Sequence, residues 1–176
     1  MLSRLIGVFT LSAGTFEEIE HDEGATGQAA LVVTLVAVAA AIGSGALAAF
    51  SGGSIIGGVI SAILSAFIGW VLWSGVVYLV GTSMFGGQAT MGEMLRVIGF
   101  AQAPQLLGLI PCIGSLIGLI WSIAAGFVAV KAGLDLDTGK AIATILIGFV
   151  VVLAVNCVLA MIFGGGAAMF SAFTGG

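Results

Sequence analysis

The stretch MGEMLRVIGFAQAPQLLGLIPCIGSLIGLIWSIAAGFVAVK, residues 91–131, decides how the rest of the chain is arranged. Within it, residues 97–130 form a run of 34 residues without a charge. As a single helix this run would be about 50 Å long, whereas the hydrocarbon core of a bilayer is about 30 Å thick. Pro104 and Pro111 interrupt the run, and each removes a backbone donor and disfavours a straight helix. We therefore expect a helical hairpin in the membrane that turns at residues 110–112.

The composition is that of an integral membrane protein. Apolar residues make up 60% of the chain, charged residues only 7%, and the mean hydropathy is +1.30. Four basic residues are too few to neutralise a run of phosphates, so nucleic acid is excluded as a partner. One histidine and two cysteines supply no zinc cluster, no disulfide framework and no Ser-His-Asp triad. We expect no cofactor, no metal site and no enzymatic activity.

The chain divides into three parts. Residues 1–27 are polar and acidic, with apolar residues at helical spacing, and predict an amphipathic segment at the membrane surface. Within this segment, Thr15 and Glu18 have the spacing of a capping box at the start of a helix. Residues 164–176 form a glycine-rich tail. The membrane domain between them, residues 28–163, predicts five transmembrane helices: 28–50, 55–80, 91–110, 112–130 and 141–163.

The positions of the basic residues support five spans. With five, Arg4, Arg96, Lys131 and Lys140 all fall on one side of the membrane, whereas a single crossing between residues 91 and 131 would divide them two against two. Basic residues are enriched in cytoplasmic segments. We therefore predict a multi-pass protein of the cell membrane, all-α, with a cytoplasmic N-terminus and its C-terminus on the opposite side.

One ionisable pair lies close to the membrane interior. Thr90 and Glu93 have capping-box spacing, which places the start of the third span near Met91. Glu93 and Arg96 then lie three residues apart on one helical face. A charged residue inside a membrane usually indicates a functional site, but an ion pair at the membrane interface explains Glu93 and Arg96 more simply.

Three amides lie in the expected spans, and they offer a different kind of site. Gln102 and Gln105 flank Pro104, and Asn156 lies in the fifth span. Such side chains either line a polar path through the membrane or bond to neighbouring helices and to carbonyls freed by proline.

The charged residues gather on the predicted cytoplasmic face. A soluble partner is steered and oriented by charge, so we expect its contacts at residues 16–23 and 131–140. The residues expected to make these contacts are Glu17, Glu18, Glu20, Asp135, Asp137 and Lys140. The alternative is a solvated acidic face that binds nothing.

Several short motifs resemble those of the Yip family, the Ypt/Rab-interacting membrane proteins, and in particular its prokaryotic branch. They are Gly99-Phe100-Ala101-Gln102-Ala103-Pro104, Ile110-Pro111-Cys112-Ile113-Gly114 and Ile120-Trp121-Ser122, followed by an Asp-rich turn into Lys140. The resemblance covers roughly residues 12–163 and implies five spans with a cytoplasmic N-terminus. Eukaryotic members are similar to trafficking adaptors that associate with small GTPases. Residues 1–27, ahead of the first expected span, are shorter than the N-terminal region of those members, and Phe100 stands where they commonly have tyrosine.

Two functional hypotheses follow. The first is a non-enzymatic adaptor or accessory subunit that associates laterally with membrane lipids and with other membrane proteins or a larger membrane complex. The second is a small transporter or channel that uses the proline-broken hairpin around Gln102, Gln105 and Asn156.

Overall fold

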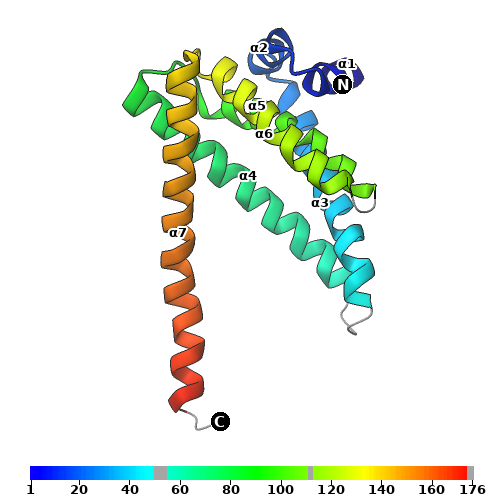
Figure 1. Cartoon of the computed structure of the whole chain (residues 1–176), viewed down its shortest axis with the longest axis vertical. Helices are drawn as coiled ribbons and strands as arrows, with labels where there is room; N and C mark the ends of the chain where they lie inside the picture. The colour runs from blue at the N-terminus through cyan, green and yellow to red at the C-terminus, as the bar shows by residue number, and fades with distance from the viewer. Residues whose placement is uncertain (50–54, 111–112, 174–176) are drawn as a thin grey trace.

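The computed structural model describes residues 1–49, 55–110 and 113–173, and within these ranges every regular element is a helix. The predicted all-α membrane fold is confirmed. In Figure 1 the helices gather near the N-terminus, and α4 and α7 diverge toward the opposite end. The elements in chain order are α1 (Leu2–Phe9), α2 (Ala13–His21), α3 (Ala25–Ala49), α4 (Ile55–Phe85), α5 (Met91–Ala101), the 3-10 helix η1 (Ala103–Leu109), α6 (Gly114–Gly133) and α7 (Thr138–Phe173).

Four of the described helices, α3, α4, α6 and α7, are long and apolar enough to cross a bilayer. The helix that contains the second predicted span, 55–80, is α4, which continues to Phe85. Its 31 residues make a helix about 46 Å long, which Figure 1 shows running obliquely to α7. Gly86 ends α4 with a left-handed backbone at φ +70°, a conformation that costs glycine little. The Gly87 amide then donates to the Gly81 carbonyl at 2.9 Å.

The third predicted span, 91–110, is not one continuous helix. It consists of the 11-residue α5 followed by the 7-residue η1. The break occurs at Pro104, which has no amide hydrogen and whose ring disfavours the α-helical approach of the Phe100 carbonyl. Proline is tolerated in the first turn of a helix, and Pro104 lies in the first turn of η1.

Helix α6 folds back along the α5–η1 segment, which it approaches closely at three of its glycines. A Cβ built on Gly114 would lie 2.0 Å from the Leu107 carbonyl oxygen, and one on Gly118 would lie 2.7 Å from the Pro104 carbonyl oxygen. At the other end of α6, a Cβ on Gly133 would lie 2.8 Å from Val97. The two segments are therefore antiparallel neighbours, as the predicted hairpin requires. Pro111 and Cys112, where the turn was predicted, lie outside the described residues.

The predicted amphipathic N-terminal segment is formed by the short helices α1 and α2, which lie across one end of the bundle (Figure 1). Val8, Phe16 and Ile19 are fully buried, whereas Leu2 and Ile6 are exposed. The predicted capping role of Thr15 is wrong because α2 already begins at Ala13. Instead, the Thr15 side chain packs against Gly7, and a Cβ built on Gly7 would lie 2.1 Å from the Thr15 hydroxyl oxygen.

Much of the predicted glycine-rich tail belongs to α7, which continues to Phe173. In a bilayer, backbone groups without partners are costly, so a helix persists through glycines that would disfavour it in water. The C-terminal end of α7 lies far from the N-terminus in Figure 1.

Candidate functional site

A buried arginine joins α5 to α2. Only 7% of the Arg96 surface is exposed, and its Nε donates a hydrogen bond to the Glu20 carbonyl oxygen at 3.0 Å. Its Nη2 donates to the same oxygen. This carbonyl lies in the last turn of α2, where backbone acceptors lack helical partners. Arg96 therefore fastens the end of α2 to α5.

The predicted ion pair between Glu93 and Arg96 does not form. The Glu93 carboxylate accepts the Thr90 amide at 2.6 Å, and the Glu93 amide donates to the Thr90 hydroxyl at 3.3 Å. The predicted capping box at Thr90 is thus confirmed. Because Glu93 is engaged in this cap, the guanidinium of Arg96 extends to α2 instead.

A second arginine, Arg4, ties α1 to α2 and to the start of α3. Its guanidinium donates to the Glu18 carboxylate at 2.9 and 3.0 Å, to Asp22 at 2.6 Å and to the Gln28 side chain at 3.3 Å. The bond from Arg4, followed by one from the Gly24 amide, holds the pKa of Asp22 below its usual value. No local pattern predicted this cluster, because the partners of Arg4 lie 14 to 24 residues after it in the chain.

Glu20 is buried, whereas the prediction placed it on the exposed acidic surface. Only 5% of its surface is exposed. Its pKa is raised from 4.5 to about 7, chiefly by burial and to a smaller extent by the nearby carboxylates of Asp135 and Glu93. The apolar residues beside it in α2, Phe16 and Ile19, turn this face of the helix toward the core.

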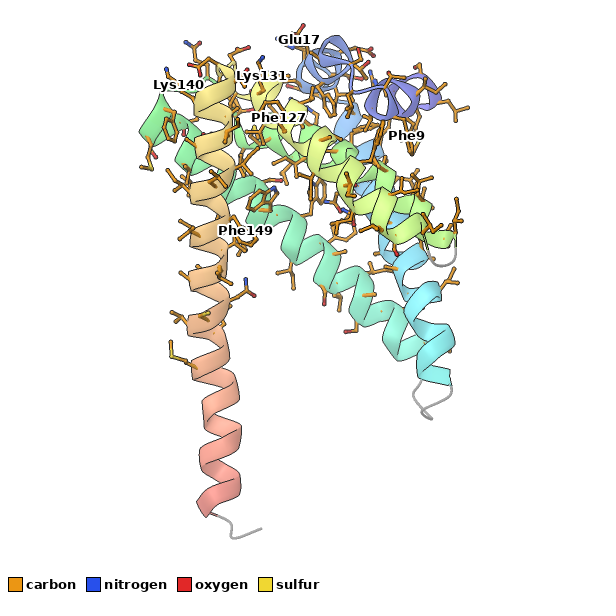
Figure 2. The ribbon with its side chains drawn as sticks, in the orientation of Figure 1. Phe9, Glu17, Phe127, Lys131, Lys140 and Phe149 are labelled. Atoms are coloured by element: carbon orange, nitrogen blue, oxygen red, sulfur yellow. The ribbon has the colours of Figure 1, made fainter. Side chains whose placement is uncertain are left out.

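The other predicted contact residues lie on the surface, and Glu18 is exposed although it is paired with Arg4. Glu17 and Lys140 lie at the same end of the molecule in Figure 2. Asp135 and Asp137 are also exposed, in the connection between α6 and α7. Asp137 accepts the Lys140 amide at 3.0 Å, so its carboxylate also caps the first turn of α7. We call the exposed surface of Glu17, Glu23, Asp135, Asp137 and Lys140 the charged end.

The motif glycines let neighbouring chains approach closely. A Cβ on Gly99 would lie 2.8 Å from Ala29 and 3.1 Å from the indole nitrogen of Trp70, so this position joins α5 to α3 and α4. Gly114 makes the corresponding approach between α6 and η1 described above.

The other motif residues also hold helices together. Phe100 is fully buried, and Pro104 is buried as well. The Trp121 indole donates to the Phe9 carbonyl at 2.8 Å and so fixes the end of α1 to α6. The motif residues that the structure describes therefore position helices, and Pro111 lies outside the described residues.

A cavity of about 450 Å³ lies within the bundle, between α3, α4, the α5–η1 junction and α6. Gln102, Gln105 and Ser122 contribute its polar lining. Trp70 and Trp73 contribute aromatic walls, and the Trp70 indole donates to the Leu95 carbonyl at 2.9 Å. The remaining lining residues are small or aliphatic: Val36, Ala37, Ala40, Ala62, Ala66, Gly69, Ile98, Ala101 and Gly126.

The cavity unites two of the three predicted amides. Gln102 immediately precedes η1 and Gln105 lies in its first turn, where the Gln105 backbone amide donates to the Gln102 carbonyl at 2.9 Å. Asn156 is separate from them, because it lies on the exposed surface of α7 and donates to the Val152 carbonyl at 2.8 Å. Ser122, which the sequence placed only within a motif, joins the two glutamines through the fold of the hairpin.

Comparison with known proteins identifies a matching family. A family model described as the Yip1 domain matches residues 6–168, which is most of the chain. No curated protein and no solved structure matches this chain.

Proposed function

We propose that this chain, which belongs to the Yip1-domain family of membrane proteins, is a non-enzymatic adaptor or accessory subunit. In this role it associates laterally with lipids and with other membrane proteins, or with a larger membrane complex. It offers the charged end to a soluble partner. We place the protein in the cell membrane with the charged end in the cytoplasm, following the preference of basic residues for that side. The α5–η1 segment then completes a fifth crossing beside α6.

The main support for this proposal is the set of hydrogen bonds that attach α1 and α2, at the charged end, to the bundle. Arg4, Arg96 and Trp121 join α1 and α2 to three helices of the bundle, α3, α5 and α6. A surface fixed before binding loses less conformational freedom when a partner docks. The sides of the bundle are apolar by contrast, with Leu64, Ile68 and other large side chains exposed along α4 and α7. Such surfaces suit lipid or other membrane helices.

The direct test is the double charge reversal Glu17→Lys and Glu23→Lys. Both side chains are exposed and neither forms an ion pair in the described structure, so the bundle is expected to fold normally. Proteins that co-purify in gentle detergent are identified by mass spectrometry at low and at moderate salt. We expect a soluble partner to be lost and its salt dependence to be reduced.

Thr26→Ala is the matched control, because Thr26 is exposed and uncharged beside Glu23. It is expected to retain every partner. The adaptor proposal is overturned if the double reversal retains all partners equally at both salt concentrations, or if the wild-type protein is recovered from membranes without any partner.

A transporter remains the second candidate, supported by the cavity that contains Gln102 and Gln105. Its test is flux of ions and small solutes into liposomes that contain the purified protein. Saturable flux that is lost in Gln105→Leu would favour transport over the adaptor role. Asn156→Leu serves as the control, because Asn156 lies outside the cavity lining.

A further inference from the structure

The intramembrane cavity contains polar groups that have no partner in the described part of the protein. The Ser122 hydroxyl is buried and has no hydrogen-bond partner among the described residues. Gln102 is half-buried and Gln105 is exposed at the mouth of the cavity, and their side-chain amides make no hydrogen bond within the described residues either. In an apolar environment an unpaired amide or hydroxyl costs free energy, and a ligand that bonds to it recovers that cost. The cavity is therefore suited to a ligand with hydrogen-bonding groups.

The lining of the cavity indicates the charge of the ligand that it can hold. None of the lining residues that the structure describes is ionisable, so a charged head would be desolvated without a counter-charge, which is unfavourable. Gln102 also lies about 16 Å along the helix axis from Met91, roughly half the thickness of the hydrocarbon core. An ion at that depth is costly, whereas an uncharged polar head is tolerated.

The apolar lining residues indicate which groups the ligand carries beside its polar head. Alanines of α3 and α4, with Gly69 and Gly126, leave an apolar surface suited to hydrocarbon chains. The amides and the hydroxyl both donate and accept, so they match a head that also does both.

We propose that the cavity binds an uncharged glycerolipid of the diacylglycerol type. Its free hydroxyl and ester carbonyls bond to Gln102, Gln105 and Ser122, and its acyl chains leave toward the bilayer. This inference stands independently of the adaptor role, because it concerns the interior of the bundle and not the charged end.

The test uses a photoactivatable diacylglycerol in phosphatidylcholine nanodiscs that contain the full-length protein. We expect labelling to map to peptides of α4, η1 and α6 and to be competed by unlabelled diacylglycerol. Phosphatidic acid with the same acyl chains should compete poorly, because its phosphate is charged. Gln105→Leu removes one hydrogen-bonding group and should weaken the apparent affinity by about fivefold to tenfold.

A second variant closes the cavity without disturbing the fold. A Cβ built on Gly69 meets no atom within 4 Å, so Gly69→Leu can place its side chain in the open space. We expect labelling to be abolished while the helical signal and thermal unfolding of the protein are kept. Asn156→Leu, an amide replaced outside the cavity, should label like the wild type.

Three outcomes would overturn the proposal. The first is equal labelling in Gly69→Leu and in the wild type, which would mean that the lipid binds elsewhere. The second is unchanged affinity in Gln105→Leu, which would reduce the site to an apolar surface for acyl chains. The third is equal competition by phosphatidic acid, which would show that the head lies outside the uncharged cavity.

Discussion

At the scale of single residues, the guanidinium of Arg96 connects helices that are far apart in the sequence. It and the Glu20 carbonyl that it binds are separated by 76 residues, and both lie in a buried environment. Hydrogen bonds to charged groups typically contribute about 1.5–3 kcal/mol. A substitution that removes this bond should therefore release α2 before it unfolds the bundle.

Arg96→Met tests this prediction, because it keeps an apolar stem and removes the donors. We expect the N-terminal segment to be cut faster by a glutamate-specific protease at Glu17 and Glu18, with little change in the membrane helices. Glu93→Gln is the control, since glutamine also serves in a capping box. Unchanged cleavage in Arg96→Met would show that α2 is held by apolar contacts alone.

We expect the attachment of α2 to depend on pH through Glu20. Because its pKa is raised from 4.5 to about 7, the folded protein binds this proton more tightly than the unfolded chain does. Stability from this group is therefore full below about pH 4.5 and is lost as pH rises to about 7. We expect protease access to α2 to increase over this interval, on a background set by the other titrating groups.

The comparison with Glu20→Gln isolates that effect. The amide has almost the same shape and does not titrate, so the increase between pH 4.5 and pH 7 should largely disappear. Glu17→Gln, on the exposed face of the same helix, is the matched control and should retain the increase in protease access. If Glu20→Gln and the wild type show the same pH dependence, the carboxyl of Glu20 is not its source.

At the scale of elements, the hairpin of η1 and α6 depends on glycine. Gly118 faces the backbone of η1, and an added Cβ would lie 2.7 Å from the Pro104 carbonyl oxygen and 3.2 Å from the Gln105 Cα. Backbone atoms cannot move aside as a flexible side chain does. The two segments would have to separate, which would also disturb the cavity beside them.

Gly118→Ala should therefore destabilise the protein by about 1–3 kcal/mol, measured as a lower midpoint of thermal unfolding in detergent. Gly126→Ala lies two turns further along the same helix, where an added Cβ meets nothing within 4 Å. It should be neutral or stabilising by up to about 1 kcal/mol, because alanine favours a helix more than glycine does. Equal midpoints for the two variants would contradict close packing at Gly118.

At the scale of the whole molecule, the prediction concerns orientation. Figure 2 shows Glu17, Lys131 and Lys140 at one end of the bundle, so all three should face the same compartment. Glu17→Cys and Lys140→Cys, each in a chain without native cysteines, should react with a membrane-impermeant thiol reagent only after permeabilisation. A chain that keeps Cys112 alone should react in intact cells, since that residue belongs to the predicted outer turn. The reverse pattern would invert the topology.

Local patterns in the sequence were sufficient for several parts of the structure. The long apolar runs predicted membrane helices, because hydrocarbon excludes unsatisfied backbone groups and so favours helices of about that length. Thr90 and Glu93 predicted a capping box because both of its partners lie within one turn. Pro104 predicted an interruption because proline changes the backbone at its own position. Each of these inferences depended on residues that are close together in the chain.

The tertiary structure decided what depends on distant residues. It placed Arg96 against the carbonyl of Glu20 and not beside the carboxylate of Glu93, although Glu93 is nearer in sequence. It buried Glu20, which composition alone assigns to an acidic surface. It also brought Gln102 and Gln105 to Ser122 while leaving Asn156 apart. The physical reason is that burial and pairing depend on which helix faces pack together, and the apolar spans resemble one another too closely for composition to specify those faces.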